Sequence, residues 1–535
     1  MKVSLSWLKE LVNFDISSTE LSSKLSIYSI GIKEQTRDCL ELDLTYNRGD
    51  LLSMRGVARE VAAVTDSKLL FSAENLPDYD LPETPVEIED ENLCPVYCLA
   101  KIEGLSVKPS PEEWAKKLKD SGIRSVNNIA DITNLIMIEY GQPLHAFDQQ
   151  KIKGDVKVRV AKKGEKIITL DGKDRNLDEK DLLITDDAGP IAVAGVMGGK
   201  DSEVTENTQS ILLEAAIFNP ISNRKTSKRH GLYSEASKRF QHGLTKTNLL
   251  QASSAAIKMY QDLGGKVTAI KLVGNLKDEI KTIKLSQEKI NSLIGIEIPS
   301  EAAESSLKKL SFTINSSWEV TVPYFRLDIN IEEDLIEEIA RMYGYERIKP
   351  KELSNKVPPK LDQTVQKNLY SLKKKLADIG LTEVQTYSFY STKILSALRL
   401  PLDALIKIAN PISSETEYMR NNLWPNLLEA VAKNIRNGIK DVAIFEIGKV
   451  YLPKVGDLPK ETYHLSIALS NGTDNPIQEL NQIAKNLKLK PNAEIEKEYS
   501  HPVRRTDGMA EIHPRYINKF GIEARVAVLE IELNN

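Results

Sequence analysis

The sequence predicts a multidomain protein of the α+β class. The chain has 535 residues, and at roughly 150 residues per domain this length corresponds to about three or four domains. Many short apolar runs broken by Gly and Asp turns occupy residues 90–275, and the flanking blocks mix helical and strand periodicity. The composition, with 41% hydrophobic and 28% charged residues, is that of globular domains and excludes a mostly disordered chain.

Charge and cysteine content exclude further classes of protein. Lys and Arg number 72 and Asp and Glu number 76, so any nucleic-acid surface is expected to be a local patch. Three cysteines exclude a disulfide framework and favour a reducing compartment, here the cytoplasm. We interpret Cys94 and Cys98 as buried thiols, with a zinc site as the alternative. We expect no membrane association, because no apolar run is long enough to span a bilayer and the amphipathic N-terminus is not a secretory signal.

Residues 1–85 are predicted to form a small α/β unit. A helix over Ser18–Leu25 begins at a Ser/Thr cap and precedes an alternating strand over Glu41–Tyr46. Helical spacing returns over Arg55–Val64. A Pro-containing linker is expected near Leu76–Pro85.

Residues 90–275 are predicted to form a strand-rich α+β domain. The pairs Asp171-Gly172 and Ala188-Gly189 lie between apolar runs, a pattern typical of β-hairpins. A helix is expected near the end of this block, over Asn248–Leu263. The expected strands are Val96–Ile102, Val156–Val160, Lys166–Leu170 and Leu182–Thr185.

Two further blocks complete the chain. Residues 280–350 are predicted to form a helix, a strand and a second helix, and residues 350–365 are predicted to be a linker. Residues 360–535 are predicted to form a mixed α/β domain with an antiparallel sheet. In the third block the expected elements are Ser300–Leu310, Trp318–Val322 and Asp334–Tyr343. In the last block they are the helices Gln366–Ile379 and Leu427–Asn437 and the strands Val442–Ile447 and Ala527–Ile531.

One internal repeat links the first and third blocks. A Tyr-x-Arg-x-Asp turn occurs in both, and a glutamate and an alanine follow it at the same spacing. The aligned pairs are Tyr46 with Tyr324, Arg48 with Arg326, Asp50 with Asp328, Glu60 with Glu338 and Ala62 with Ala340. Helix, strand and helix follow in the same order, so the two small units are predicted to share a fold.

Four carboxylates, those of Asp328, Asp334, Glu337 and Glu338, form the sharpest acidic cluster. A helix that starts at Asp334 places Glu337 and Glu338 on the same side of its first turn. Carboxylates this close repel one another unless a cation lies among them, and an all-oxygen set suits Mg²⁺ or Ca²⁺. The alternative is a solvated helix start, where acids favour the macrodipole. The first repeat lacks two of these acids, so the fold does not require them.

Three short motifs in the second block indicate a ligand site. His145 follows a Pro-fixed turn and is either a structural cap or a ligand contact. Paired glycines in Val196–Gly199 let a ligand or a backbone segment approach closely. Glu214 lies in an apolar strand-like run, where an acid without a partner is costly to bury. It is therefore expected to accept hydrogen bonds from a specific group or to form a structural salt bridge.

A basic stretch with interleaved aromatic residues follows over residues 224–240. Such a combination suits a phosphate backbone and stacked bases. A solvated basic face is the alternative. The candidate nucleic-acid contacts are Arg224, Lys228, Arg229 and Arg239.

Taken in order, these motifs resemble the β subunit of bacterial phenylalanyl-tRNA synthetases. The resemblance rests on G-Q-P-L-H-A-F-D at 141–148, M-G-G at 197–199, L-L-E-A-A-I-F at 212–218 and R-H-G-L-Y-S-E-A-S-K-R-F at 229–240. It extends to R-L-D-I-N-I-E-E-D-L-I-E-E-I-A-R-M-Y-G-Y at 326–345 and to the opening S-L-S-W-L-K-E-L-V.

The resemblance implies an (αβ)₂ heterotetramer that joins phenylalanine to tRNA(Phe) with ATP. In this family the α subunit carries the class II synthetic site and binds ATP. The β subunit implied for this chain has a B3/B4-type editing domain over 90–275, which hydrolyses tyrosyl-tRNA(Phe), and a B5-type domain over 280–350. Residues 360–535 would form a degenerate class II synthetase-like module with an antiparallel sheet.

The same resemblance assigns site residues. The acidic cluster Asp328, Asp334, Glu337 and Glu338 matches positions that bind Mg²⁺ in a site shared with α. The editing pocket would contain His145, Glu214 and Ser234 as catalytic residues and Gly198 and Ala236 as substrate-binding residues. Arg224, Lys228, Arg229 and Arg239 would contact the tRNA.

Several departures from the family pattern are visible. The chain runs from Glu34–Thr36 into Leu42 without room for an OB-type tRNA-binding insert. We also expect no anticodon-binding domain of the usual family form within residues 1–535. Ser234 stands where the pocket commonly has Thr, and it keeps a hydroxyl. No Gly-rich segment ending in Arg follows the strand Asp441–Gly448, so we expect no ATP site in the last block.

The sequence therefore predicts the β subunit of an active synthetase. One alternative is a free-standing trans-editing hydrolase, and the survival of the acidic cluster argues against it. The other alternative is a non-catalytic scaffold derived from the family, which would have lost His145 and Glu214. Co-purification with a class II partner separates these possibilities.

Overall fold

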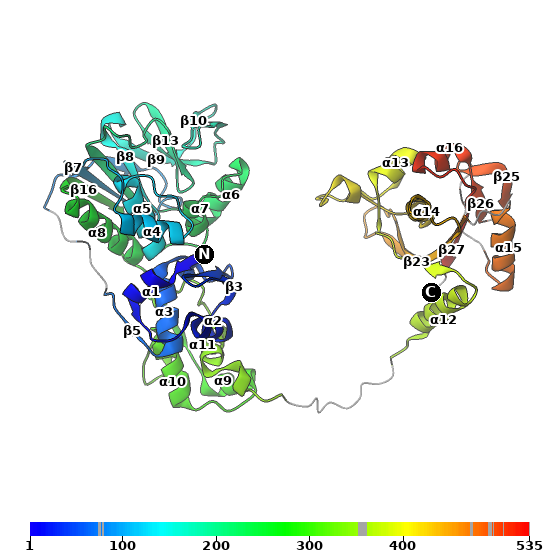
Figure 1. Cartoon of the computed structure of the whole chain (residues 1–535), viewed down its shortest axis with the longest axis horizontal. Coiled ribbons are helices and arrows are strands. Elements are labelled where there is room, and N and C mark those ends of the chain that lie inside the picture. Colours follow the sequence, from blue (N-terminus) through cyan, green and yellow to red (C-terminus); the bar gives the residue numbers. More distant parts are fainter. Residues whose placement is uncertain are drawn as a thin grey trace. The chain divides into compact units, whose positions relative to one another are not determined.

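The computed structural model describes residues 1–72, 76, 80–350, 361–470, 475–490, 495, 497–506 and 508–533. It divides into two compact units, residues 1–352 and 353–535, which are described separately (Figure 1). Most of the linker predicted over 350–365 and part of that predicted over Leu76–Pro85 lie outside the described residues.

The N-terminal part of the first unit is the small α/β fold that the sequence predicts. The predicted helices are confirmed, one of them capped by the Ser17 hydroxyl. The predicted strand starts and ends earlier, because residues 44–48 turn away from the sheet. The elements are β1 (Lys2–Ser4), α1 (Leu5–Leu11), β2 (Val12–Asn13), α2 (Ser18–Tyr28), β3 (Gly31–Gln35), β4 (Cys39–Asp43), η1 (Gly49–Leu52), α3 (Met54–Thr65) and β5 (Lys68–Leu69). Strands β1, β4 and β3 form one sheet in that order.

The third part of this unit repeats that architecture, as the sequence predicts. Its sheet has the order β17-β19-β18, which matches β1-β4-β3 element by element. Helices α3 and α11 begin the same number of residues after Tyr46 and Tyr324. The elements are β17 (Thr282–Lys284), α9 (Gln287–Ile294), α10 (Ser300–Lys309), β18 (Thr313–Ile314), β19 (Glu319–Thr321), α11 (Glu332–Tyr343) and η3 (Tyr345–Arg347).

The start of α11 corrects the sequence prediction. The helix begins at Glu332 and not at Asp334. The Asp334 carboxylate accepts hydrogen bonds from the backbone N–H groups of Asn330 and Ile331, at 2.7 and 3.0 Å. These contacts satisfy donors at the helix N-terminus, and they fix Asp334 as a capping residue.

The central part consists of two sheets and a helical layer. The four-stranded sheet has the order β16-β7-β15-β8, and the five-stranded sheet has the order β14-β13-β12-β9-β6. One core lies between the sheets, and another lies between the four-stranded sheet and helices α5 and α8. The predicted strands, both hairpins and the helix at α8 are confirmed. The strands are β6 (Val86–Ile88), β7 (Val96–Glu103), β8 (Leu144–Asp148), β9 (Val156–Val160), β10 (Lys166–Ile168), β11 (Asp174–Asn176), β12 (Leu182–Asp186), β13 (Gly189–Val193), β14 (Met197–Gly198), β15 (Ser210–Ile217) and β16 (Lys266–Gly274).

Four helices of the central part were not expected from the sequence. The helices of this part are α4 (Glu112–Asp120), α5 (Asn128–Tyr140), α6 (Pro220–His230), α7 (Glu235–Phe240) and α8 (Lys246–Asp262), with η2 (Gln149–Lys151). Helix α5 has no polar face, because Ile132 and Ile136 pack on the sheet while Leu135 and Ile138 pack on the N-terminal part. A helix buried on two sides lacks the amphipathic period that identifies most helices.

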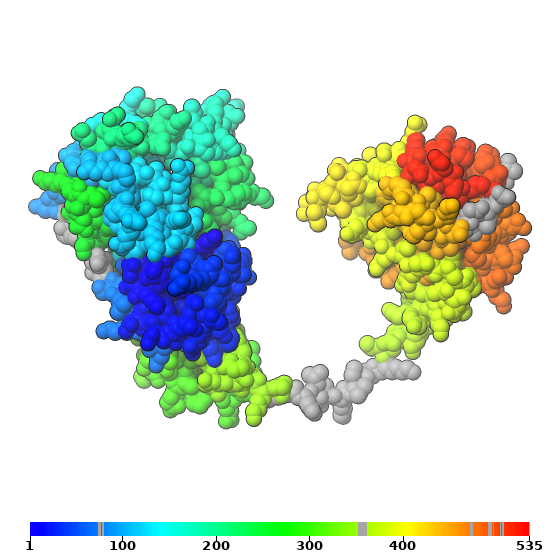
Figure 2. Space-filling model, in the orientation of Figure 1, coloured from blue at the N-terminus to red at the C-terminus, as the bar shows by residue number. Residues whose placement is uncertain are grey.

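The three parts of the first unit are in contact. The N-terminal part, dark blue in Figure 2, lies between the central part in cyan to green and the third part in green. Helix α3 packs on α5, and α2 packs on α11. The two related folds and the central part therefore form one body.

The second unit contains a six-stranded sheet in the order β20-β23-β24-β27-β26-β25, antiparallel except for the β20–β23 pair. The predicted helices and strands are confirmed. The elements are α12 (Thr364–Asp378), β20 (Thr382–Glu383), β21 (Phe389–Tyr390), α13 (Thr392–Leu398), η4 (Leu402–Ala404), η5 (Ser414–Thr416), β22 (Tyr418–Met419), α14 (Trp424–Arg436), β23 (Val442–Leu452), β24 (Lys460–Ser470), α15 (Pro476–Asn486), β25 (Ser500–Thr506), β26 (Met509–Ile512), α16 (Pro514–Ile517), η6 (Asn518–Phe520) and β27 (Ala527–Leu533). Among the described residues no helix is both long and apolar enough to cross a membrane.

Candidate functional site

A pocket of about 390 Å³, partly open to solvent, lies between the two sheets of the central part. Strands β8 and β15 supply one wall, strands β12 and β13 with the loop after them supply a second wall, and α7 supplies a third. The residues that line it are Pro143, Leu144, His145, Ile184, Ala192, Val193, Gly195, Val196, Met197, Gly198, Glu214, Ala236 and Phe240. Four of the five predicted pocket residues are among them.

His145 and Glu214 are brought together by strand register. They are Cα partners in the antiparallel pair β8–β15. Their neighbours Phe147, Leu212 and Ala216 belong to the core between the sheets. Alternate residues of a strand share a face, so both polar side chains point toward the same core.

Glu214 is an acid with little access to water. Glu214 is 6% exposed, and burial raises the pKa of its carboxyl to about 8. No ion pair or hydrogen bond to this carboxyl is present among the described residues, so the structural salt bridge considered above is not observed. At neutral pH the carboxyl is mainly protonated, and it can both donate and accept a hydrogen bond.

Tyr97 is a residue of this face that sequence reasoning missed. It lies opposite Ala216 and therefore diagonally across from Glu214 on the four-stranded sheet. Its hydroxyl is buried without a hydrogen-bond partner in the described part of the chain. The alternation of Tyr97 with Leu99 along β7 was the pattern that could have placed it beside Glu214.

His145 is held as a neutral ring. Burial lowers the pKa of its imidazole to about 4. The ring packs edge-on against Phe147 with centroids 4.6 Å apart, and its Nε2 atom is buried without a hydrogen-bond partner among the described residues. A neutral imidazole with an unused nitrogen can accept a proton or orient a water molecule.

Gly198 makes room for that ring. A Cβ atom at this position would lie 2.8 Å from His145 Nε2 and 2.7 Å from His145 Cε1. Such contacts are too short for a real side chain, so glycine is required if His145 is to keep its place beside the pocket.

Ser234 and Ala236 lie at the start of helix α7, which forms one wall of the pocket. The Ser234 hydroxyl caps α7 by accepting from Ser237 N at 3.0 Å, and it donates to the Val196 carbonyl at 2.7 Å. Ser234 itself does not line the pocket. It fixes α7 to the pocket loop, and this attachment places Ala236 and Phe240 in the wall.

The basic stretch separates into exposed and buried members. Arg224 and Lys228 are exposed on α6, and Arg229 pairs with Asp181. The structure corrects the prediction for Arg239, which is 1% exposed and donates to Leu52 O and Glu235. Arg239 joins α7 to the N-terminal part and cannot contact a nucleic acid on the surface.

The four acids of the third part do not gather around one point. Arg326 binds Asp328 through two hydrogen bonds and Glu338 through a third. Glu337 is exposed, and Asp334 caps α11. Within the described ranges no group of three or more His, Cys, Asp and Glu side chains is placed to hold a metal ion. In place of the predicted single cluster there are therefore two arginine-bound acids, one capping acid and one exposed acid.

In the second unit, a buried ion pair and a buried histidine–glutamate contact lie on one face of the sheet. Arg420 pairs with Glu446 at 2.7 Å, and His464 lies 2.9 Å from Glu530. Glu530 also accepts from the backbone N–H groups of residues 423 and 424 at the start of α14. The carboxylates of Glu446 and Glu530 thus have partners within the unit, whereas His464 Nε2 is buried without a hydrogen-bond partner among the described residues.

Comparison with known proteins adds family information. A B3/4 domain model matches residues 93–265, and a tRNA synthetase B5 domain model matches residues 283–345. A phenylalanyl tRNA synthetase beta chain CLM domain model matches residues 350–492. The first two matches cover the pocket and the second repeat, respectively.

Curated relatives that match most of this chain are named as beta subunits of phenylalanine–tRNA ligase. The beta subunit of phenylalanine–tRNA ligase from Moorella thermoacetica is 41% identical over 82% of this chain and 56% of its own length. The Aquifex aeolicus protein of the same name is 43% identical over 77% of this chain and 53% of its length. The Bacillus subtilis protein of that name is 40% identical over 81% and 55%. The chain spans about half the length of these relatives.

Proposed function

Because the chain belongs to the family of phenylalanine–tRNA ligase beta subunits, we propose that it is the beta subunit of such a ligase. It supports the ATP-dependent attachment of phenylalanine to tRNA(Phe) by an alpha subunit. It also hydrolyses mischarged tyrosyl-tRNA(Phe) in the pocket beside His145 and Glu214. The complex is an (αβ)₂ heterotetramer that works in the cytoplasm.

The observation that carries the editing proposal is the buried, unpaired Glu214 carboxyl facing the pocket. Tyrosine differs from phenylalanine by one hydroxyl. A buried polar group that hydrogen-bonds this hydroxyl is left unpaired by phenylalanine, and such a loss discriminates between substrates by orders of magnitude. Tyr97, diagonal to Glu214 on the sheet, is a second buried polar group near this carboxyl, although it does not line the pocket.

Ester hydrolysis requires a positioned water molecule and stabilisation of the developing oxyanion. The neutral His145 Nε2 orients the water. The water oxygen attacks the ester carbonyl, the bond to the ribose oxygen breaks, and that oxygen takes the proton. Free tyrosine and tRNA(Phe) leave. Ser234 is a positioning residue, Gly198 admits the ester, and Ala236 shapes the wall beside the ring.

The synthetic chemistry belongs to the alpha subunit, which binds ATP. The second unit of this chain serves as a degenerate class II-like module that packs against alpha. The ion pair Arg420–Glu446 and the contact His464–Glu530 support this assignment, because the chain's own side chains occupy this face of the sheet.

The family also implies Mg²⁺ in a site shared with alpha. Asp328, Asp334, Glu337 and Glu338 do not fit the ion as a set, because Arg326 already binds two of them. Asp334 and Glu337 have no arginine or lysine partner among the described residues. They would supply two carboxylates to a site that the alpha subunit completes, and the ion would supply positive charge there.

Surface cations hold the tRNA in this proposal. Arg224 and Lys228 are exposed and contact the phosphate backbone. Arg229, which pairs with Asp181, also contacts a phosphate. The alternatives of a free-standing hydrolase or a scaffold are not favoured, since the relatives are beta subunits and the pocket keeps His145 and Glu214.

Co-expression with a class II alpha subunit tests the assignment. We expect the two chains to co-elute in size-exclusion chromatography and to aminoacylate tRNA(Phe) only together. A monomer that never associates with the alpha chain contradicts the proposal.

A further inference from the structure

An exposed cluster of Tyr46, Arg224 and His242 lies on the first unit, outside the editing pocket. Tyr46 is 58% exposed, yet its ring and its hydroxyl contact other side chains and the backbone. Its ring lies 4.5 Å from the His242 ring, centroid to centroid, and the Arg224 guanidinium lies 5.4 Å from its centroid. Its hydroxyl donates to Gln241 O at 3.1 Å and accepts from Arg224 at 3.4 Å. We call these three residues the platform.

The platform is built from two parts of the fold. Tyr46 comes from the turn before η1, Arg224 comes from α6, and His242 comes from the turn that follows α7. Gly49 permits the approach, since a Cβ atom there would lie 2.8 Å from His242 Cβ. A large aromatic side chain that is fixed but exposed offers a flat surface at little cost in conformational freedom.

His242 contributes a neutral ring. Its Nδ1 atom lies 2.6 Å from the carbonyl of Lys238, and burial lowers the pKa of the imidazole, with nearby cations acting in the same direction. The charges of the platform are therefore those of Arg224 and the exposed lysines beside it, Lys225, Lys228 and Lys238.

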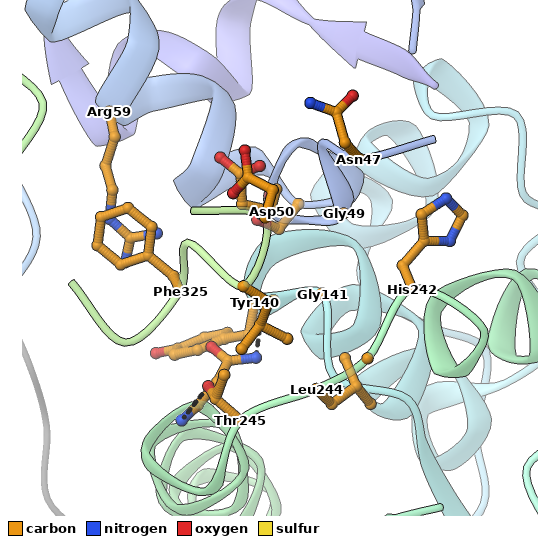
Figure 3. A pocket seen from close by; sticks show the side chains of 15 residues that line it. Asn47, Gly49, Asp50, Arg59, Tyr140, Gly141, His242, Leu244, Thr245 and Phe325 are labelled. Carbon is orange, nitrogen blue, oxygen red and sulfur yellow. Dashed lines mark hydrogen bonds between the residues drawn. The ribbon is translucent and has the colours of Figure 1, made fainter. Parts of the chain in front are cut away.

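A second pocket adjoins the platform, as Figure 3 shows, with Asn47 and His242 at its edge. It has about 520 Å³ of empty space and lies where the corresponding turns of the two repeats meet residues 242–248. The Arg59 guanidinium lies in its wall, 4.0 Å from the Phe325 ring centroid and 3.5 Å from the Tyr324 hydroxyl. Among the described residues no carboxylate forms an ion pair with Arg59.

The platform is close to the editing pocket through α7. Ala236 and Phe240 line that pocket, and His242 lies six residues after Ala236. At 1.5 Å per residue the helical part of this separation, from Ala236 to Phe240, is about 6 Å, and His242 follows two residues later. A strand whose terminal residue enters the editing pocket therefore has its preceding nucleotides within reach of the platform.

We propose that the platform binds an unpaired nucleotide of single-stranded RNA, with the base stacked on Tyr46 and His242 and a phosphate at Arg224. The RNA continues along the second pocket, where Arg59 offers a further cation. Aromatic faces interleaved with cations are the usual means of holding single strands. That this RNA is the 3′ acceptor end of a tRNA rests on the proposed function. The binding of a single-stranded RNA to the platform does not rest on it.

Fluorescence anisotropy with a labelled RNA tetranucleotide, ACCA, tests the proposal on the full chain in complex with its alpha subunit. Tyr46→Ala should weaken binding by about fivefold or more, because one stacked base is lost. Tyr46→Phe, which keeps the ring, should bind as the unmutated protein does. Tyr233→Ala is the matched control, since Tyr233 is 77% exposed in the same basic stretch but lies outside the platform.

A second measurement separates charge from stacking. Arg224→Ala should reduce the salt dependence of binding by about one phosphate contact, whereas Tyr46→Ala should leave the slope unchanged. Equal affinities for Tyr46→Ala and Tyr233→Ala, with both proteins folded by circular dichroism, overturn the proposal. If the unmutated complex does not hydrolyse tyrosyl-tRNA(Phe), only the proposed editing function is refuted. Binding of the tetranucleotide is a separate test, because this RNA carries no ester.

Discussion

Arg341 of the second repeat forms a buried ion pair with Glu60 of the first, through hydrogen bonds of 2.9 and 3.0 Å. The same guanidinium binds Glu338, which corresponds to Glu60 in the repeat. The equivalent place in the first repeat is Ala63, so only one arginine serves both glutamates. The two related folds are thus joined by a charge network that neither carries alone.

This network predicts a large loss of stability when the shared cation is removed. Arg341→Ala leaves Glu60 and Glu338 with one arginine each, and a broken buried pair costs about 3–5 kcal/mol. Chemical unfolding should show this loss, whereas Arg347→Ala, at an exposed arginine nearby, should change little. Equal unfolding midpoints for the two variants would show that the pair contributes nothing.

Glu214 predicts a pH dependence of stability. Its folded pKa of about 8 is raised by burial, so the folded protein binds this proton more tightly than the unfolded chain does. The stability associated with it is present below the unfolded pKa of about 4.3 and is lost as pH rises toward 8. Glu214→Gln should therefore stabilise the protein most at alkaline pH.

Thermal melts at pH 6 and pH 9 check this expectation. The difference between Glu214→Gln and the unmutated protein should grow with pH, and Glu206→Gln, at an exposed glutamate, should show no such growth. A constant difference at the two pH values would mean that Glu214 is not buried in its neutral form.

Gly198→Ala should displace His145 from its place beside the proposed editing pocket. The new methyl group would lie 2.8 Å from His145 Nε2, so the imidazole must move from its place. We expect tyrosyl-tRNA(Phe) hydrolysis to fall by about 10²-fold or more, since general acid–base groups contribute at least that factor. Aminoacylation by the complex should be unchanged. Hydrolysis at the original rate would show that His145 does not orient the water.

The proposed metal site predicts that the charges of Asp334 and Glu337 on α11 are required. Asp334→Asn with Glu337→Gln keeps the cap acceptor at Asp334 and removes two charges. We expect Mg²⁺-dependent aminoacylation and complex stability to fall. Glu338→Gln, in contrast, should lower the stability of the folded chain, because Glu338 pairs with Arg326 and Arg341. Unchanged Mg²⁺ dependence in the double variant would refute the metal proposal.

Much of the fold could be predicted from local patterns. Strands with alternating residues, the hairpins at Asp171-Gly172 and Ala188-Gly189, and the repeat all follow from spacing along the chain. Helix α5 could not be predicted in this way, because apolar residues surround it on both sides. Hydrophobic periodicity identifies a helix that has one apolar face and one polar face, and α5 lacks this contrast.

The site residues were harder to predict where their contacts are with residues distant in the sequence. The grouping of His145, Gly198, Glu214 and Ala236 was expected by family resemblance, and strand register explains His145 with Glu214. Arg239 looked like a surface cation because its neighbours are basic, but it is buried against Leu52 O. The acidic cluster looked complete in sequence, but the spacing of acids does not show which of them Arg326 will bind.

The most direct measurement is deacylation of tyrosyl-tRNA(Phe) and phenylalanyl-tRNA(Phe) by the assembled complex. The unmutated complex should hydrolyse the tyrosyl ester and spare the phenylalanyl ester, because our proposal pairs the tyrosine hydroxyl, which phenylalanine lacks, with the buried Glu214. Glu214→Ala should reduce this preference, and His145→Ala should lower the rate for the tyrosyl ester. If the unmutated complex leaves tyrosyl-tRNA(Phe) intact, the pocket has no editing activity and the central claim is wrong.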